Sequence, residues 1–331
     1  LKPSPYPRTS MTSVVALTAL AIALNVQATW NQGILNGVAP EEPSFHHVSF
    51  LEAREAPVNQ THHLVSIMLG RYKDLGVYFI ALADREQHVR QFAREKLGVG
   101  ELDIIGEGAH IPKLPLGFLQ VQGEIHGKLP LDKITPAEVA VSQSHTLALE
   151  YFKNDDAIKH GLFFEDDITI DDDVFAMAIN STEMNSNNVM EVLYTMGQTS
   201  DELGWQGLNL GRCWDDCPSK IMKTYETAGI DLVETCNSYC AHAYFMTKKG
   251  AEVMIKYTRP IRASGDGIRC ALSQEGLLKY YSTSPRMFNQ DRDDQKSGLH
   301  STDRLPECVH HKAVVCKRRE PWVNAIVTGQ F

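Results

Sequence analysis

The sequence predicts an α/β fold in which helices flank a mostly parallel sheet. Segments rich in aromatic and β-branched residues alternate along the chain with segments that carry helix start and stop signals. The segment 162–164 is an uninterrupted apolar run, which is typical of a strand buried on both faces of a parallel sheet. Strands that alternate with helices in this way indicate a layered α/β domain.

The first strand and helix of this pattern lie close together near residue 80. Gly76–Leu82 is rich in aromatic and β-branched residues and predicts a strand. Asp84 is placed to cap a helix over 85–97, which Gly98 ends. A strand followed at once by a helix predicts the opening unit of an α/β sheet.

A second helix has a sharp start signal. Thr135 suits the N-cap, Pro136 suits the first helical position, and Glu138 at the third completes a capping box. The apolar pattern predicts that this helix runs to Phe152 and stops at 154–156, just before the apolar strand.

The acidic triplet Glu165-Asp166-Asp167 directly follows the apolar strand. Open α/β sheets bind their ligands at the carboxyl ends of the strands. Three adjacent carboxylates repel one another, and a divalent cation would relieve that repulsion. Because alternate residues of a strand face the same way, Glu165 and Asp167 share one face and Asp166 has the other. The triplet therefore predicts an Mn²⁺ or Mg²⁺ site at Glu165 and Asp167, whose hard oxygen atoms suit these ions. Asp167 is the first candidate ligand, and the sequence leaves open which of the three carboxylates touches the ion.

Two other acidic motifs match this segment poorly. In a calcium loop that starts at Asp167, the sixth position would be Asp172 instead of Gly and the twelfth Ala178 instead of Glu. A phosphatase of the haloacid dehalogenase type would place a nucleophilic Asp where Glu165 stands, two residues before Asp167 and four before Thr169. The extra methylene of Glu would misplace the attacking oxygen, so the phosphatase interpretation is disfavoured.

The C-terminal half continues the alternation of strands and helices. Strands are predicted at 205–210, 239–246 and 278–282, and a helix at 247–259. Asp266 lies between two glycines in a tight turn that presents one carboxylate. It is the candidate general base, while capping of its own turn is the structural alternative.

The composition excludes some classes of function. The chain has 331 residues, of which 43% are hydrophobic, and a net charge of −9, which argues against a nucleic-acid partner. The seven cysteines form no Cys-x-x-Cys pair and all lie in the C-terminal half. Disulfides with one thiol left free fit a secreted chain better than structural zinc does, although the close pairs Cys213/Cys217 and Cys236/Cys240 leave zinc open.

The N-terminal segment predicts entry into the secretory pathway. Residues 14–24 are apolar except for Thr18 and follow Lys2 and Arg8, a pattern typical of a signal peptide. The predicted organisation is a signal peptide or signal anchor at 1–28, a stem at 29–70, a single catalytic domain at 71–292 and a tail at 293–331. The expected location is the lumen of the endoplasmic reticulum or Golgi, or outside the cell, with membrane attachment through the apolar segment where it is not cleaved.

Taken together, the motifs resemble glycosyltransferase family 25, which includes the collagen galactosyltransferases and bacterial lipooligosaccharide glycosyltransferases. The similarity covers about 75–290 of the chain. It rests on five segments in order: Tyr78–Arg85, Thr135–Ala140 with Ser144-His145, Phe163–Asp167, His242–Tyr244 with Lys249–Ala251, and Asp266 followed by Ser284-Pro285 and Gln290. The chain departs from the family pattern at Ala81, where Asn is usual, and at Ala137, where Gly is usual.

The resemblance implies a GT-A-like fold, related to the Rossmann fold, a nucleotide-sugar donor and a divalent metal, usually manganese. The donor would be a UDP-sugar, and the acceptor a hydroxyl group of a protein or glycan. The implied donor-binding residues are Arg85, Ser144, His145 and Asp166. The expected function is metal-dependent, inverting transfer of a hexose, galactose or glucose. The alternative is a catalytically inactive module on the same fold that binds a nucleotide sugar or a glycan.

Overall fold

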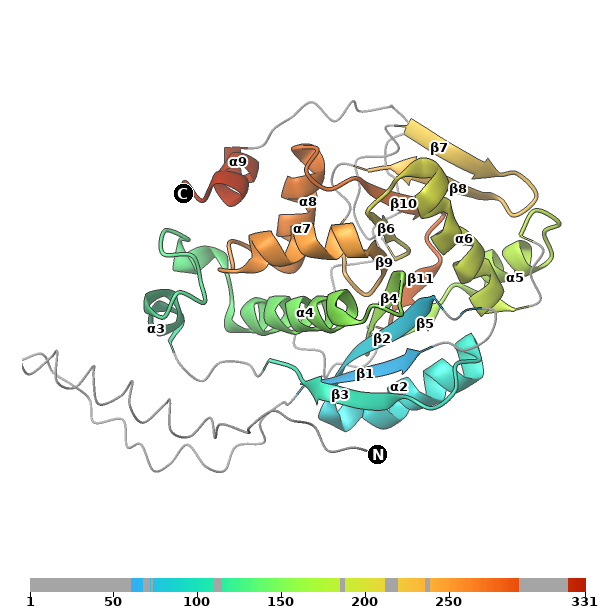
Figure 1. The fold of residues 1–331 in the computed structure, drawn as a ribbon, viewed down its shortest axis with the longest axis horizontal. Helices are drawn as coiled ribbons and strands as arrows, with labels where there is room; N and C mark the ends of the chain where they lie inside the picture. The colour runs from blue at the N-terminus through green and yellow to red at the C-terminus, as the bar shows by residue number, and fades with distance from the viewer. Residues whose placement is uncertain are drawn as a thin grey trace, which may run out of the picture. The chain divides into compact units, whose positions relative to one another are not determined.

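The computed structural model describes residues 61–67, 72, 74–109, 115–184, 188–211, 220–235, 239–291 and 321–331 (Figure 1). All of them belong to one compact unit, Pro57–Phe331. The apolar segment 14–24, most of the predicted stem and five of the seven cysteines lie outside the described residues, which include Cys240 and Cys270. Within the described residues, no helix combines the length and the apolar character that crossing a bilayer requires.

Nine strands form one sheet within the described residues, in the order β3-β1-β2-β4-β9-β6-β10-β8-β7. A separate ribbon of two short strands, β5 and β11, lies beside it. The strand bounds are β1 Thr61–Ile67, β2 Leu75–Leu82, β3 Asp103–Glu107, β4 His160–Glu165, β5 Ile168–Ile170, β6 Gly207–Asn209, β7 Lys220–Tyr225, β8 Ile230–Glu234, β9 Ala243–Thr247, β10 Tyr280–Ser284 and β11 Phe288–Gln290.

The large sheet is mixed, so the prediction of a mostly parallel sheet is wrong. Only β2–β4 and β6–β10 pair in parallel among the described strands. Strand β9 lies between β4 and β6 and is antiparallel to both. Short connections cause two further antiparallel pairs, β1–β2 and β7–β8, because a parallel crossover needs a dozen or more residues. The coarser prediction of an α/β sheet flanked by helices is confirmed.

One helix start signal in the sequence is confirmed and another is wrong. Asp84 does not cap a helix, because the segment 83–85 has Leu82 as its N-cap and the segment 86–92 has Arg85, both without a side-chain cap. At α4, the Thr135 side chain accepts a hydrogen bond from Glu138 N, and the Glu138 side chain accepts one from Thr135 N, so the predicted capping box is confirmed. The predicted helix over 85–97 consists of three helical segments, 83–85, 86–92 and 93–97, the last of which ends at Gly98. The α-helices are α2 Glu86–Phe92, α3 Leu116–Val121, α4 Pro136–Asn154, α5 Asp172–Ile179, α6 Val189–Leu203, α7 Lys248–Thr258, α8 Gly265–Gln274 and α9 Pro321–Thr328.

Both faces of the sheet are buried, as the apolar strand predicted. The side chains of successive residues of β4 point to opposite faces of the sheet, because side chains alternate along a strand. Phe163 stacks between Tyr78 and Tyr244 at ring distances of 4.9 and 5.0 Å, on the face covered by α4, α7 and α8 (Figure 1). Phe164 stacks on Phe79 at 5.2 Å on the other face, whose core includes residues of α2, α5 and α6.

The folded unit includes parts of the predicted stem and tail. Strand β1 lies in the predicted stem but pairs with β2 and β3. Helix α9 lies in the predicted tail, yet its Val323 and Ile326 are buried against the core. The Arg262 guanidinium donates to the carbonyl of Ile326 at 3.0 Å, near the end of α9. The histidines and Ser66 of β1 interrupt its apolar pattern, which explains why the sequence did not indicate a strand there.

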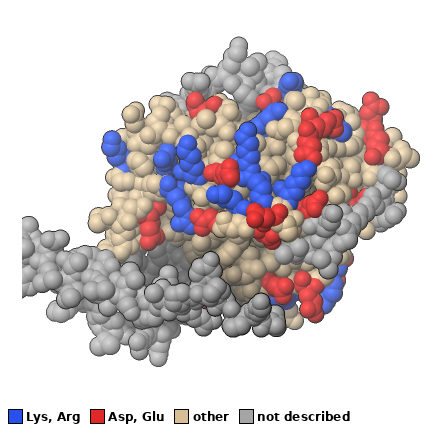
Figure 2. Space-filling model, in the orientation of Figure 1, with Lys and Arg blue, Asp and Glu red and all other residues tan. Residues whose placement is uncertain are grey.

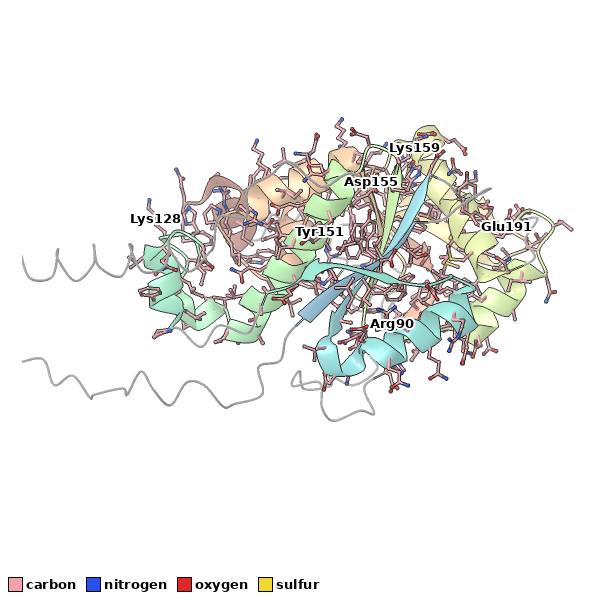
Figure 3. All side chains as sticks on the ribbon, turned by 60° about the horizontal axis from the view of Figure 1, so that its bottom comes forward. Arg90, Lys128, Tyr151, Asp155, Lys159 and Glu191 are labelled. Atoms are coloured by element: carbon pink, nitrogen blue, oxygen red, sulfur yellow. The ribbon has the colours of Figure 1, made fainter. Side chains whose placement is uncertain are left out.

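The long helix α4 reaches the edge of the sheet. Its Tyr151 lies over β3, where a Cβ at Gly106 would meet the Tyr151 hydroxyl (Figure 3). On the same side, His63 of β1 is 1% exposed, and its Nε2 lies 2.8 Å from the Ser144 carbonyl oxygen. His63 is therefore a buried strand residue with a polar partner on α4.

The face of the molecule shown in Figure 2 carries Lys and Arg next to Asp and Glu, with both signs interspersed. Elsewhere among the described residues, two of the ion pairs join surface residues: Lys223 lies 2.8 Å from Glu202, and Lys96 lies 3.6 Å from Asp172. Exposed pairs of this kind add little to stability because water and salt screen them. The exclusion of a nucleic-acid partner stays a prediction.

Candidate active site

The carboxyl ends of four strands meet at one edge of the sheet. Strands β2 and β4 are parallel, as are β6 and β10, and β9 is antiparallel to both β4 and β6. The four parallel strands therefore run in one direction and end at the same edge. Glu165 is the last residue of β4, and Asp166 and Asp167 form the turn that leads into β5. The acidic triplet thus lies at the edge where α/β sheets bind ligands.

A cavity of about 380 Å³ opens beside this edge. Its walls come from α4, the end of β4, the segment before β9, the start of α8 and the end of β11. It brings together the following polar residues: Glu138, Ser142, His145, Thr146, Glu165, Asp167, Tyr244, Asp266, Arg269 and Gln290. Four of the predicted site residues therefore share one cavity, and the volume lies in the range of small-molecule sites.

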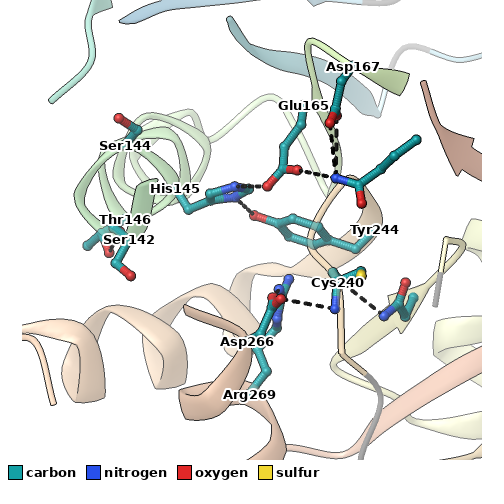
Figure 4. Close-up of polar contacts among 12 residues, drawn as sticks. Ser142, Ser144, His145, Thr146, Glu165, Asp167, Cys240, Tyr244, Asp266 and Arg269 are labelled. Atoms are coloured by element: carbon teal, nitrogen blue, oxygen red, sulfur yellow. Dashed lines mark hydrogen bonds and ion pairs between the residues drawn. The ribbon is translucent and has the colours of Figure 1, made fainter. Parts of the chain in front are cut away.

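Glu165 and Asp167 face the same amide group. Gln290 Nε2 lies 3.3 Å from Glu165 Oε2 and 3.2 Å from Asp167 Oδ2 (Figure 4). Burial raises the pKa of Glu165 to about 8, and the nearby Asp266 adds to the rise. Burial is also the main cause that raises the pKa of Asp167 to about 7, and the charges of Glu165 and Asp166 contribute to the rise. The metal-free site therefore resists full ionisation, as a pair of buried carboxylates does without a cation.

His145 connects Glu165 to Tyr244. Its Nε2 lies 2.9 Å from Glu165 Oε1, and its Nδ1 lies 2.9 Å from the Tyr244 hydroxyl (Figure 4). Burial lowers the pKa of His145 to about 3, and the positive charge of Arg269 lowers it further. A neutral imidazole donates from one nitrogen and accepts at the other, so its tautomer sets the direction of this hydrogen-bonded chain.

Asp266 lies on α8, and both of its carboxylate oxygens have partners. Oδ1 forms an ion pair with Arg269, and Oδ2 accepts a hydrogen bond from Cys240 N at 3.0 Å (Figure 4). The Arg269 side chain is 3% exposed, and its guanidinium lies 4.9 Å from the Tyr244 ring centre. Cys240 is disulfide-bonded and has a φ of 72°, a conformation that favours glycine. Cys270, the other described cysteine, is buried in α8.

Asp166 and Arg85 pair with each other at the neighbouring strand end. Arg85 NH1 lies 3.6 Å from Asp166 Oδ1, and Leu82 N donates to Asp166 Oδ2 at 2.7 Å. Burial raises the pKa of Asp166, while the hydrogen bond from Leu82 and the charge of Arg85 oppose the rise. Neither side chain lines the cavity, so Asp166 is separated from Glu165 and Asp167, as strand alternation predicted.

Ser144 also lies outside the cavity wall. Its Oγ accepts a hydrogen bond from Ala109 N at 3.0 Å, and the residue is 1% exposed. Among the residues predicted to bind the donor, His145 is the one that lines the cavity.

Sequence reasoning gave no role to four residues of the cavity: Ser142, Tyr244, Arg269 and Gln290. Arg269 had a local signal, because it stands three residues after Asp266 and opposite charges at that spacing meet on a helix. Tyr244 and Gln290 come from strands more than 75 residues away from the acidic triplet along the chain. Without an alignment, nothing in the sequence places such distant residues together.

Protein atoms supply only part of the ligands that a divalent cation in this cavity would need. Within the described ranges, no group of three or more His, Cys, Asp or Glu side chains has metal-binding geometry. Two carboxylates, Glu165 and Asp167, nevertheless converge on one point. Mg²⁺ is commonly held by one or two carboxylates together with substrate phosphates and water, and Mn²⁺ accepts the same oxygen ligands. The donor set therefore fits a cation that arrives with a phosphate ligand.

Comparison of the sequence with protein-family models and with curated proteins finds no match.

Proposed function

We propose that this chain is a metal-dependent, inverting glycosyltransferase of the secretory pathway. It would move a hexose, galactose or glucose, from a UDP-sugar to a hydroxyl of a protein or glycan acceptor. The observation that carries the proposal is one cavity, at the carboxyl end of β4, that holds Glu165 and Asp167 together with Asp266. A GT-A-like fold is part of the proposal, supported by the parallel pair β2–β4 with its acidic turn.

Glu165 and Asp167 are the residues that would hold Mn²⁺ or Mg²⁺. When bound, the cation would supply positive charge to the leaving diphosphate, where negative charge develops. Gln290 donates to both carboxylates and His145 contacts Glu165, so these two residues fix the direction of the carboxylate oxygens. Arg85 and Asp166, which pair at the adjacent strand end and do not line the cavity, would contact the nucleotide part of the donor.

Asp266 is the candidate base for the acceptor hydroxyl. The ion pair with Arg269 and the hydrogen bond from Cys240 N fix its orientation. Each carboxylate oxygen keeps a second lone pair that can accept a proton. Its side chain is 30% exposed, so the acceptor hydroxyl can reach it from the cavity.

The test is donor turnover by the purified chain. With Mn²⁺ present, the wild type is expected to release UDP slowly from UDP-galactose or UDP-glucose, and Asp167→Ala to abolish the release. A thermal-shift screen of UDP-, GDP- and CMP-sugars, with and without Mn²⁺, identifies the donor class, because a ligand that binds the folded state raises its melting temperature. Metal-independent turnover at an unchanged rate in Asp167→Ala would contradict the metal site.

One observation favours the alternative, an inactive module that binds a nucleotide sugar or a glycan. The Gln290 amide satisfies both carboxylates without a cation. Under this alternative, a UDP-sugar or glycan raises the melting temperature while no UDP is released at any Mn²⁺ concentration. Release of UDP above the uncatalysed rate would exclude it.

A further inference from the structure

The cavity wall contains a buried hydroxyl that has no hydrogen-bond partner. Ser142 of α4 is 1% exposed, and its Oγ contacts no donor or acceptor among the described residues. A buried polar group left without a partner is costly, and each such group in a folded protein requires an explanation. Ser142 lines the cavity, so a bound molecule can supply the missing partner.

The position of Ser142 on α4 differs from that of the nearby Ser144. Residues two positions apart on a helix point about 200° apart. Ser144 Oγ is satisfied by Ala109 N, whereas Ser142 Oγ lies on the other side of the helix (Figure 4). The hydroxyl without a hydrogen-bond partner therefore lies on the side of α4 that faces the cavity.

The first turn of α8 lies next to Ser142. A Cβ built on Gly265 would lie 3.8 Å from Ser142 Oγ. The N–H groups of Gly265 and Asp266 belong to the first turn of α8, where no earlier carbonyl of the helix can accept from them. Asp266 adds an acceptor carboxylate to the same wall. This part of the cavity thus combines a hydroxyl, backbone donors and a carboxylate.

A second cavity lies beside the first. It has a volume of about 630 Å³, and Thr146 and Thr258 line both cavities. Its other polar walls include Gln122, Glu124 and Gln143. A second polar cavity therefore shares part of its wall with the cavity that Ser142 lines.

We propose that Ser142 Oγ and the first turn of α8 form the subsite that binds the hydroxyl groups of an uncharged sugar acceptor. The assignment of this sugar as the acceptor rests on the proposed function. A sugar hydroxyl both donates and accepts, as does Ser142 Oγ, and it can pair with N–H groups and a carboxylate together. An anionic ligand would place its charge next to the Asp266 carboxylate on the same wall, which disfavours its binding.

The experiment measures sugar binding by the full chain without metal or nucleotide. Ligand-observed NMR titrations use methyl β-D-galactoside and methyl β-D-glucoside, with methyl β-D-glucuronide as the anionic counterpart. At least one neutral glycoside is expected to bind, and the glucuronide to bind more weakly. Ser142→Ala should raise the Kd about five- to tenfold, the effect of losing one neutral hydrogen bond. Its melting temperature should stay equal or rise, because an unsatisfied buried hydroxyl is removed.

Ser200→Ala is the matched control. Ser200 is a buried helical serine whose Oγ lies 2.6 Å from His160 Nε2, far along the chain from the cavity residues. This variant should melt at a lower temperature and keep the wild-type Kd.

Three results would overturn the subsite. They are no binding of either neutral glycoside, an unchanged Kd in Ser142→Ala, or equal affinity for the glucuronide. A fall in the melting temperature of Ser142→Ala as large as that of Ser200→Ala would also overturn it, by revealing an internal partner for Oγ. Because donor and metal are absent, glycoside binding without any later UDP release would contradict the proposed function and leave the subsite standing.

Discussion

Asp167→Asn tests the electrostatics of the cavity. Asn has nearly the shape of Asp and can still accept a hydrogen bond from Gln290 Nε2, which lies 3.2 Å from Asp167 Oδ2. It cannot ionise. Its effect on stability therefore isolates the cost of placing a negative charge beside Glu165 and Asp166.

The magnitude follows from the raised pKa of Asp167. Burial, then the charges of Glu165 and Asp166, raise that pKa from 3.8 to about 7. A carboxyl whose pKa is higher in the folded than in the unfolded state stabilises the fold below pH 4, and this stabilisation is lost as the pH rises to about 7. At about 1.36 kcal/mol for each pKa unit, the wild type loses up to about 4 kcal/mol over that range. Asp167→Asn avoids the loss, which corresponds to a melting temperature up to about 10 °C higher at pH 8.

The assay is thermal unfolding of wild type and variant between pH 4 and pH 8 in the presence of a chelator. The two proteins should melt at similar temperatures near pH 4 and diverge as the pH rises. Asp132→Asn, at a side chain that is 73% exposed, is the control and should follow the wild type throughout. Added Mn²⁺ should raise the melting temperature of the wild type at pH 8 more than that of Asp167→Asn. Parallel pH profiles, or a variant less stable at pH 8, would refute the reasoning.

Two further predictions concern the scaffold. Thr135→Ala removes the capping box with Glu138 and should lower the unfolding free energy by about 1 kcal/mol, measured by urea denaturation; an unchanged midpoint would contradict the role of the cap. Gly250→Ala should cost about 1–3 kcal/mol in the same assay, because a Cβ there would lie 2.9 Å from the Gln206 carbonyl carbon. Gly100→Ala, where a Cβ meets no atom within 4 Å, should change stability little, and equal effects of the two substitutions would argue against the packing of α7.

Local signals in the sequence were sufficient to predict the helices α4 and α7 and the central strands, but not the helices α3, α5 and α9. Thr135-Pro136 and Glu138 marked the start of α4, and the apolar residues 162–164 marked a strand buried on both faces. Such signals do not determine whether neighbouring strands run parallel or antiparallel. Whether β9 joins the sheet parallel or antiparallel depends on the path of the chain between β6 and β9, not on residues 243–247 themselves.

The same distinction applies to the candidate site. Strand alternation correctly separated Asp166 from Glu165 and Asp167, because these three residues are adjacent in the chain. The proximity of Gln290 and Asp266 to the triplet depends on tertiary structure. Asp266 was singled out because a glycine stands on each side of it, but the structure places it in the first turn of α8 instead of the predicted tight turn. Gln290 had no chemical signal beyond its place in a resemblance.

The central position of β9 has a consequence for how the chain folds and for where it can be shortened. Strands β4 and β6 are made at least 30 residues before the strand that lies between them, so both wait for a partner from later in the chain. Such non-local pairing slows folding. A variant that stops before Ala243 would leave the edges of β4 and β6 open, and open edges promote aggregation. Truncation from the C-terminus should therefore yield insoluble protein before it yields a smaller folded unit.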